Sequence, residues 1–267
     1  MNENGITKSL HTQFAKTLTK QFARAVNEYA LIENGDSIAV CISGGKDSTL
    51  MAALFKDYQS FSQMDFSVKY LVMNPGYSAK DMALIQANAE RIGIELYEYK
   101  TEIFRHTADT RDNPCFLCSK MRRGHLYKQA QAMGCNKIAL GHHFDDVIES
   151  ILMGMLYGGQ VQTMMPRLSA QNYEGMQLIR PMYFIRERDV IEWQNANDFT
   201  FAPCGCALAK REDGSKRAEI KRLISTLAAD NPQIEQNIFR SVHNVRLDRI
   251  ISYKDENGVH SFLDKQQ

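Results

Sequence analysis

The apolar residues of the chain recur with two alternating periods. Near the N-terminus they return every third or fourth residue, which predicts an amphipathic helix over about 10–31. A short continuous apolar run follows at 37–42 and is typical of a buried parallel strand. The two patterns then alternate, with further strands predicted at 68–73, 95–100, 137–140 and 177–180 and helices at 48–58, 79–92, 116–133, 144–157 and 186–197.

This alternation predicts an α/β fold, a Rossmann-like parallel sheet with helices on both faces. The carboxyl ends of parallel strands meet at one edge of the sheet, and that edge is where such folds bind ligands. The loops after Ile42, Met73 and Leu140 are therefore expected to share one crevice.

The composition is that of a globular protein with little overall charge. Apolar residues make up 44% of the 267 residues, and the formal net charge is +1, so any nucleic-acid surface has to be a local patch. No apolar run approaches the roughly 18 residues of a membrane span, and the polar N-terminal stretch does not read as a signal peptide. We therefore expect a cytoplasmic location and no membrane partner. The domain expected is 1–253, with the helix near 10–31, a basic helical segment near 210–250 and a flexible tail at 254–267.

A glycine-rich loop follows the first predicted strand and opens a helix. Two glycines let the backbone approach a ligand closely, and the helix start directs free N–H groups at an anion. Lysine adds a positive charge, whereas aspartate suits a phosphate site only if Mg²⁺ is present. The spacing differs from that of the Walker loop, and the plain alternative is a Gly-Gly turn with an aspartate near a helix start. The residues of this predicted nucleotide site are Ser43, Gly44, Gly45, Lys46, Asp47 and Ser48.

A second polar loop follows the fourth predicted strand. It contains Gly141, His142 and His143, and then Asp145 and Asp146 at the start of a helix. Adjacent carboxylates hold a metal or cap a helix, and imidazoles can contact phosphate or ribose. Capping alone would account for one aspartate, so the cluster indicates a functional loop beside the first one.

The six cysteines fall into two classes. Cys115 and Cys118 form a CxxC pair at a predicted helix start, where thiolates are favoured. Cys204 and Cys206 form a CxC pair far away in the sequence. Four thiolates suit structural zinc, and three or four suit a 4Fe–4S cluster, so spacing alone leaves both open. The other two, Cys41 and Cys135, are interpreted as inert, Cys41 as a small buried strand residue.

Several motifs, in order, carry a resemblance to a known family. The sequence Ser-Gly-Gly-Lys-Asp-Ser at 43–48 resembles the PP-loop of the ATP-pyrophosphatases, HUP-type proteins that cleave ATP to AMP and pyrophosphate. Over about 10–250 the chain looks like the TtcA-type tRNA 2-thiocytidine synthetases of that superfamily. The matching motifs lie at 40–48, 118–124, 138–146, 157–159 and 179–181, the last being Ile179-Arg180-Pro181.

The resemblance implies an ATP-dependent tRNA sulfurtransferase that adenylates a base oxygen, expected to be that of a cytidine in the anticodon loop. Sulfur carried by a 4Fe–4S cluster then replaces the oxygen, and AMP and pyrophosphate are released. The implied cluster ligands are Cys115, Cys118 and Cys204, with Cys206 as an alternative or fourth ligand. At the third ligand site this chain departs from the family pattern, because the family has Pro-Cys-x-x-Cys and this chain has Pro-Cys-Gly-Cys. The alternative ligand Cys206 arises from that difference.

The remaining assignments concern roles and partners. ATP is expected with Mg²⁺, with Met73, Gly141 and His142 beside the nucleotide. The implied partners are tRNA and a sulfur donor such as a cysteine desulfurase, and a homodimer is one assembly considered. The catalytic residues assigned are Lys46, Asp47, Asp145 and Asp146.

Basic side chains cluster at 120–128 and 210–222, directly after the assigned cluster ligands. Such runs are commonly solvated helix faces, but here their position favours contact with RNA. Two other functions fit part of the pattern. One is an ATP-dependent ligase or amidase of a small molecule with a structural zinc site, and the other is a non-catalytic nucleotide-binding module.

Overall fold

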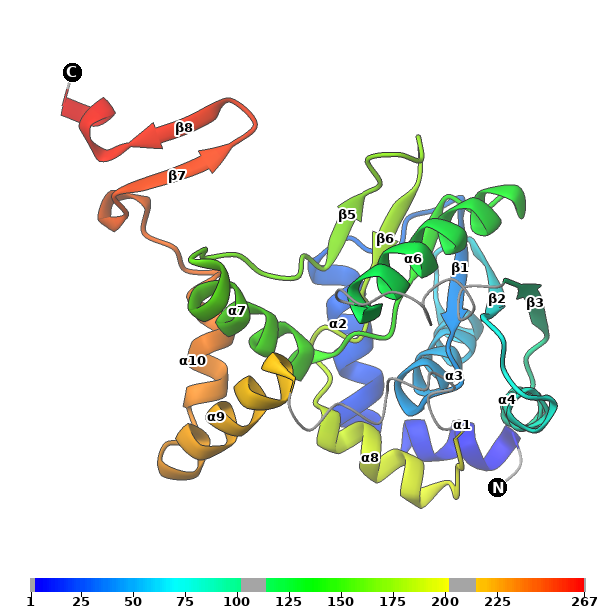
Figure 1. Ribbon diagram of the computed structural model, residues 1–267. Helices are drawn as coiled ribbons and strands as arrows, with labels where there is room; N and C mark the ends of the chain where they lie inside the picture. The colour runs from blue at the N-terminus through cyan, green and yellow to red at the C-terminus, as the bar shows by residue number, and fades with distance from the viewer. Residues whose placement is uncertain (1–2, 102–113, 202–214, 267) are drawn as a thin grey trace. The chain divides into compact units, whose positions relative to one another are not determined.

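The computed structural model describes residues 3–101, 114–201 and 215–266 (Figure 1). Contacts divide the chain into two compact units. Unit 1 comprises Met1–Val147 and Met164–Ser215, and unit 2 comprises Ile148–Thr163 and Lys216–Gln267. Each unit is described by itself. Within the described residues, no helix combines the length and the apolar character that crossing a bilayer requires.

Unit 1 is built on a six-stranded sheet with the strand order β3-β2-β1-β4-β6-β5. All neighbouring pairs are parallel except β5 with β6, which is antiparallel. The strands are β1 Asp36–Ile42, β2 Phe66–Asn74, β3 Leu96–Lys100, β4 Lys137–Ala139, β5 Arg167–Ser169 and β6 Gln177–Ile179. The predicted parallel sheet is thus confirmed. The edge strand β5 was missed, because three residues are too few to show an alternating pattern.

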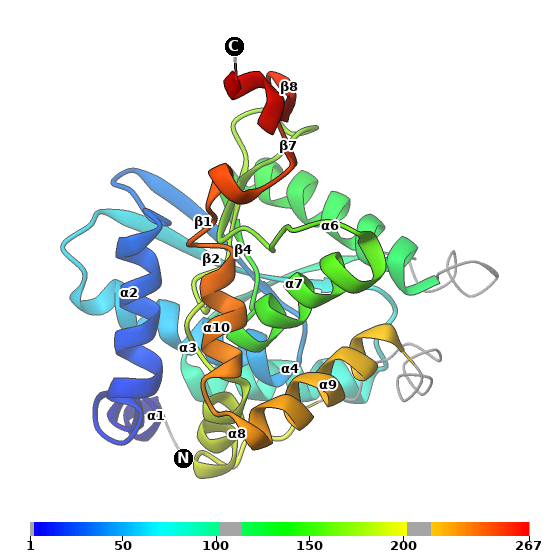
Figure 2. The same ribbon diagram turned by 90° about the vertical axis from the view of Figure 1, so that its left-hand side faces the viewer.

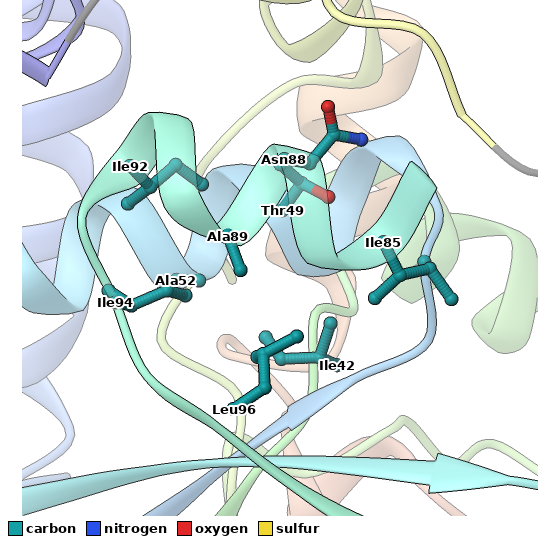
Figure 3. Close-up of a pocket in the computed structure, with 10 residues that line it drawn as sticks. Ile42, Thr49, Ala52, Ile85, Asn88, Ala89, Ile92, Ile94 and Leu96 are labelled. Atoms are coloured by element: carbon teal, nitrogen blue, oxygen red, sulfur yellow. The ribbon is translucent and has the colours of Figure 1, made fainter. Parts of the chain in front are cut away.

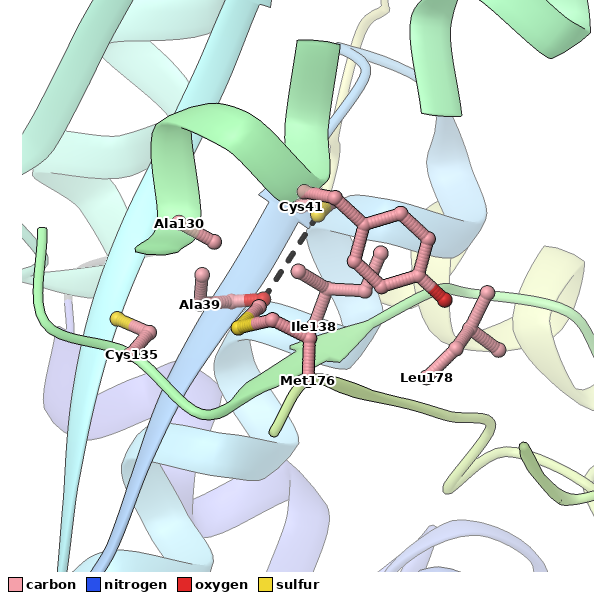
Figure 4. Close-up of a cluster of buried hydrophobic side chains, with 8 residues drawn as sticks. Ala39, Cys41, Ala130, Cys135, Ile138, Met176 and Leu178 are labelled. Atoms are coloured by element: carbon pink, nitrogen blue, oxygen red, sulfur yellow. Dashed lines mark hydrogen bonds between the residues drawn. The ribbon is translucent and has the colours of Figure 1, made fainter. Parts of the chain in front are cut away.

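Helices cover both faces of the sheet, as predicted. The alternation of side chains along β1 shows this directly. Ala39 and Cys41 pack toward α6, beside Ala130 (Figure 4), whereas Ile42 points toward α3 and α4 (Figure 3). The helices of this part are α1 Glu3–His11, α2 Lys20–Glu28, α3 Lys46–Phe61, α4 Ala79–Ile92, α6 Pro114–Ala132, α7 Phe144–Gly158, which continues into unit 2, and α8 Glu187–Ala196.

The N-terminal helix predicted over 10–31 is wrong in one respect, because it is not continuous. The α-helix α1 ends at His11, a π-helical turn spans Ala15–Thr19, and α2 then begins. The apolar residues at 10, 14, 18 and 22 are all buried, so their spacing continues through the break and conceals it. The Thr19 hydroxyl donates to the Leu10 carbonyl at 2.9 Å, which satisfies a backbone acceptor near the break.

The sequence signals at the two ends of α4 were sufficient to predict its bounds, which match the prediction of 79–92. Its first turn is capped by the Ser78 hydroxyl, which accepts from the Asp81 amide at 3.1 Å. Its end is set by Gly93, which lies in the left-handed region at φ +76°. Both signals act within four residues of the helix and can therefore be recognised in the sequence.

The amino ends of the strands hold a buried ion pair rather than a ligand site. The Lys137 side chain is 2% exposed, and its ammonium lies 2.6 Å from a carboxylate oxygen of Asp36. It also donates to the Leu31 carbonyl at 3.1 Å. A buried charge needs such partners, because breaking a buried pair costs about 3–5 kcal/mol. Each charge of this pair therefore depends on the other to remain buried.

The prediction that Cys41 is a buried strand residue is confirmed, and Cys135, which was interpreted as inert, is buried as well. Both are free thiols in the apolar cluster between α6 and the sheet, and the Cys41 thiol donates weakly to the Ala39 carbonyl (Figure 4). Burial, with a smaller effect of Cys135, raises the pKa of the Cys41 thiol to about 12. Cys41 is therefore not a thiolate at neutral pH and is a poor metal ligand.

Unit 2 is helical with a terminal hairpin (Figure 2). Besides the later part of α7 it contains α9 Lys216–Asp230, α10 Ile234–Ser241, the short helix Leu247–Arg249, β7 Ser252–Asp255, β8 Gly258–Ser261 and the short helix Phe262–Gln266. The antiparallel pair of β7 and β8 falls partly where a flexible tail was expected. It gives that segment secondary structure, and the flexibility of the tail stays a prediction.

The basic start of α9 is held by partners within unit 2. Arg217 pairs with Glu149 at 3.1 Å, and the Lys216 ammonium lies 4.9 Å from the centroid of the Tyr157 ring. The Tyr157 hydroxyl in turn donates to Glu219 at 2.6 Å. These contacts attach α9 to α7, so part of its positive charge has a structural role.

Candidate nucleotide-binding site

The predicted phosphate loop leaves the carboxyl end of β1 and enters α3 at Lys46. Gly44 has φ +80°, and a Cβ there would lie 2.7 Å from Cδ1 of Ile85. Only glycine fits this position without strain or displacement. Gly45 is the N-cap residue of α3, and no described side chain caps that helix start. The first amides of α3 are therefore suited to an anion.

A small apolar pocket lies behind the loop, between α3 and α4 (Figure 3). Its polar side chains already have partners. The Thr49 hydroxyl donates to the Gly45 carbonyl at 3.0 Å, and the Asn88 amide donates to the Thr200 carbonyl at 2.8 Å. We interpret this pocket as a small packing gap beside Gly44 and not as the nucleotide site.

The two serines of the loop bond to the loop itself. The Ser48 hydroxyl accepts from the Ser43 amide and donates to the Gly45 carbonyl, each at 3.1 Å. The hydroxyls of Ser43 and Ser48 are also 3.1 Å apart. These bonds fix the shape of the turn, and direct contact of the serines with phosphate stays a prediction.

Lys46 lies between two carboxylates. Its ammonium is 3.0 Å from Asp47 and 3.3 Å from Glu187 at the start of α8. Burial lowers the pKa of Lys46, but the two carboxylates more than offset this, so the pKa lies above that of an ordinary lysine. Lys46 thus stays charged at neutral pH. Glu187 was missed in the sequence, although its place after β6, at the carboxyl edge of the sheet, was a usable signal.

The second predicted loop lies against the first. A Cβ on Gly141 would lie 3.2 Å from the carbonyl carbon of Asp47 and 3.3 Å from the amide nitrogen of Ser48. The loops after β1 and β4 therefore meet at the start of α3, as the strand order predicted. His142 follows directly and accepts from the guanidinium of Arg180 at 3.3 Å.

The two adjacent aspartates have different partners. Asp146 accepts from the His143 amide at 3.0 Å, which is a helix-capping contact at the start of α7. Asp145 accepts from the Glu187 amide at 2.7 Å and pairs with Arg186 at 3.3 Å. These contacts join α7 to α8 within unit 1. A role of either aspartate on metal or substrate stays a prediction.

Comparison with known proteins places the chain in a family. Residues 12–203 match the model of a family described as a PP-loop domain. The chain is 33% identical over 242 residues to the tRNA-cytidine(32) 2-sulfurtransferase of Coxiella burnetii, covering 90% of this chain and 93% of that protein. It is 34% identical over 234 residues to tRNA-cytidine(32) 2-sulfurtransferase 1 of Francisella philomiragia, covering 86% and 90%. The chain belongs to the PP-loop family and, within it, to the tRNA-cytidine(32) 2-sulfurtransferases.

A solved structure agrees on the fold of this PP-loop protein. The U34-tRNA thiolase NcsA from Methanococcus maripaludis, determined with its 4Fe–4S cluster, matches with a TM-score of 0.67 at 21% identity. The match covers 86% of this chain and 78% of that one. It supports the predicted Rossmann-like arrangement of the PP-loop family.

The remaining predicted site residues of this PP-loop protein are described in part. Met73 is 4% exposed near the end of β2. Cys115 and Cys118 are the second and fifth residues of α6, but their side chains are outside the described part of the structure. Cys204 and Cys206 lie outside the described residues. Among the residues that are described, no group of three or more His, Cys, Asp or Glu side chains could hold a metal ion.

A bridge that the sequence did not predict ties α6 to the PP-loop. The Tyr77 hydroxyl donates to the Ser43 carbonyl at 2.9 Å and accepts from Arg122 at 3.1 Å. Arg122 lies four residues after Cys118, one turn further along α6. The helix that carries the CxxC motif is thus connected through one side chain to the loop assigned to ATP.

Substituting Gly141 by alanine is expected to reduce ATP-dependent activity about tenfold while the fold is kept, because small displacements at a reacting site are costly. The new Cβ would press on the backbone of Asp47, which cannot turn away as a flexible side chain can. Pyrophosphate release with ATP and tRNA, together with thermal melting, measures the effect. Gly158→Ala is the control, since a Cβ there meets nothing within 4 Å. Equal activity of the two variants would contradict the close approach of the loops.

Proposed function

We propose that this chain is an ATP-dependent tRNA sulfurtransferase that replaces a base oxygen of cytidine with sulfur, as the names of its relatives describe for cytidine 32. The observation that carries the proposal is the packing of the Gly141 loop against the start of α3, beneath the glycine turn at 43–48. That arrangement would cradle a phosphate, and the chain is about one third identical to those enzymes.

ATP fits the residues present. The triphosphate would accept from the uncapped amides at the start of α3, with Gly44 and Gly45 allowing close approach. Met73, Gly141 and His142 would flank the rest of the nucleotide. Lys46 faces Asp47 and Glu187, so this group already carries net negative charge. Adding a triphosphate there requires a cation, which supports Mg²⁺ held between the phosphates and Asp47. Asp145 and Asp146, which have protein partners in this structure, would help to position the metal or the substrate from the same edge.

The cluster would be held by Cys115, Cys118 and Cys204, with Cys206 as the alternative or fourth thiolate. The start of α6 suits thiolates, because a helix N-terminus lowers the pKa of a thiol. When bound, a 4Fe–4S cluster would carry the sulfur used in the transfer. The bridge through Tyr77 and Arg122 supports a place for these thiolates near the PP-loop.

The reaction balances without a change of oxidation state if sulfur enters as sulfide. The base oxygen attacks the α-phosphorus of ATP, the bond to the bridging oxygen breaks, and pyrophosphate leaves. Sulfide then adds to the base carbon, and AMP leaves with the former base oxygen. Lys46 and His142 would stabilise charge on the phosphate oxygens during the first step. We further propose a cysteine desulfurase or similar sulfur donor, a cytoplasmic location and a homodimeric assembly.

The test is mass spectrometry of tRNA nucleosides from cells that lack this protein. We expect 2-thiocytidine to disappear and to return when the wild-type gene is restored, whereas other thiolated nucleosides persist. Loss of a different thiolated nucleoside would contradict the assigned base. Unchanged levels of every thiolated nucleoside would contradict sulfur transfer to tRNA altogether.

A further inference from the structure

The ring of His142 has one nitrogen whose role is fixed by its neighbour. The Nε of Arg180 donates to Nδ1 of His142 at 3.3 Å. A guanidinium has only donors and no acceptor, so Nδ1 of His142 has to be unprotonated. In the neutral ring the hydrogen then sits on Nε2, and that nitrogen can act only as a donor.

Arg180 is itself held in place. It follows the last residue of β6, is 5% exposed, and its Nη1 donates to the Met165 carbonyl. Among the described residues it forms no ion pair with a carboxylate. Burial is the largest effect and lowers its pKa to about 10, although the charge of the nearby Asp146 acts in the opposite direction, so Arg180 is still a cation at neutral pH. Burying a guanidinium is costly unless it is hydrogen-bonded, and the Met165 carbonyl and Nδ1 of His142 supply such bonds.

The location of the pair connects it to the nucleotide site. His142 directly follows Gly141, where a Cβ would lie 3.2 Å from the carbonyl carbon of Asp47 and 3.3 Å from the amide nitrogen of Ser48 at the start of α3. A ring fixed as an Nε2 donor at this place is suited to a phosphate or ribose oxygen. Arg180 belongs to Ile179-Arg180-Pro181, one of the motifs that carry the family resemblance, and the sequence alone assigned no role to it.

We propose that Arg180 is a positioning residue that fixes His142 as the neutral Nε2–H tautomer, so that His142 donates a hydrogen bond to bound ATP. The proposal rests on the proposed function only for the identity of the nucleotide. Sulfur transfer and the cysteines do not enter it, so it can be tested on the purified chain with ATP and without RNA.

The direct test is ¹⁵N NMR of the histidine rings in the wild-type protein, with the His142 signals assigned by their loss in His142→Gln. We expect Nδ1 of His142 to resonate as an unprotonated nitrogen and Nε2 as a protonated one, both before and after ATP is added. A protonated Nδ1 in the free protein would overturn the proposal. This measurement needs no variant of Arg180, so it tests the tautomer of His142 even if such variants fail to fold.

A double-mutant cycle tests whether Arg180 acts through His142. Arg180→Gln and His142→Gln are each expected to weaken ATP binding about tenfold, the lower end for a hydrogen bond to a charged ligand. The double variant should be no weaker than either single one. Fully additive losses by calorimetry would overturn the proposal, as would an unchanged tautomer and affinity in Arg180→Gln. If the NMR and binding results are as expected but the protein does not thiolate tRNA, the proposed function is contradicted and the role of Arg180 is not.

Discussion

Replacing Cys115 or Cys118 by alanine is expected to abolish sulfur transfer to tRNA while leaving ATP binding unchanged. Both cysteines lie at the start of α6, where a helix N-terminus favours thiolates, and neither belongs to the phosphate loop at 43–48. A cluster that loses one of three protein ligands is not held. The measurements are 2-thiocytidine formed in vitro under anaerobic conditions, iron content, and ATP affinity by calorimetry. The same change at Cys204 and at Cys206 shows which of the two is needed.

Buried thiols provide the control for this experiment. Cys135 is 4% exposed in the core between α6 and the sheet, so Cys135→Ala removes a thiol without touching the proposed ligands. It is expected to keep sulfur transfer and to lower stability by about 1 kcal/mol. Full sulfur transfer by the Cys115 and Cys118 variants would contradict the cluster assignment. Loss of ATP binding in them would show that they act on the fold instead.

Replacing Lys46 by methionine is expected to lower kcat/KM for ATP by at least about 100-fold, the usual effect of removing one preorganised group that stabilises developing charge. Lys46 is the first residue of α3 and supplies positive charge where the phosphates are proposed to bind. Its removal also leaves Asp47 and Glu187 without their shared cation, so the site becomes more repulsive to ATP. Pyrophosphate release measured against ATP concentration gives the value.

Lys80→Met is the matched control, because Lys80 is an exposed lysine in the first turn of another helix of unit 1, α4. It is expected to behave as the wild type. If the Lys46 and Lys80 variants had the same kinetics, Lys46 could not be the cation of the phosphate site. Thermal melting of both variants separates a kinetic effect from unfolding.

The structure also shows which parts of the site could be found without it. The glycine loop and the Gly141 loop were found because each follows an apolar strand and opens a helix, and the strand order brings the two together. The residues around these loops were not found. Glu187 and Tyr77 contact the loop from segments 141 and 34 positions away from Lys46 and Ser43, respectively. The place of Glu187 after β6 indicated the right edge of the sheet, but no local pattern indicated which residue either side chain would contact.

The sequence by itself determined the order and type of most elements of unit 1, the ends of α4, and the residues of both loops. These features depend on side-chain periodicity, capping and glycine conformation, which act over a few neighbouring residues. Only the tertiary structure decided the break between α1 and α2, the hairpin of β7 and β8, the pairing of Lys46 with Glu187, and the contact of Arg180 with His142. Those depend on packing and on strand register, which bring distant side chains within hydrogen-bonding distance and leave no periodic trace along the chain.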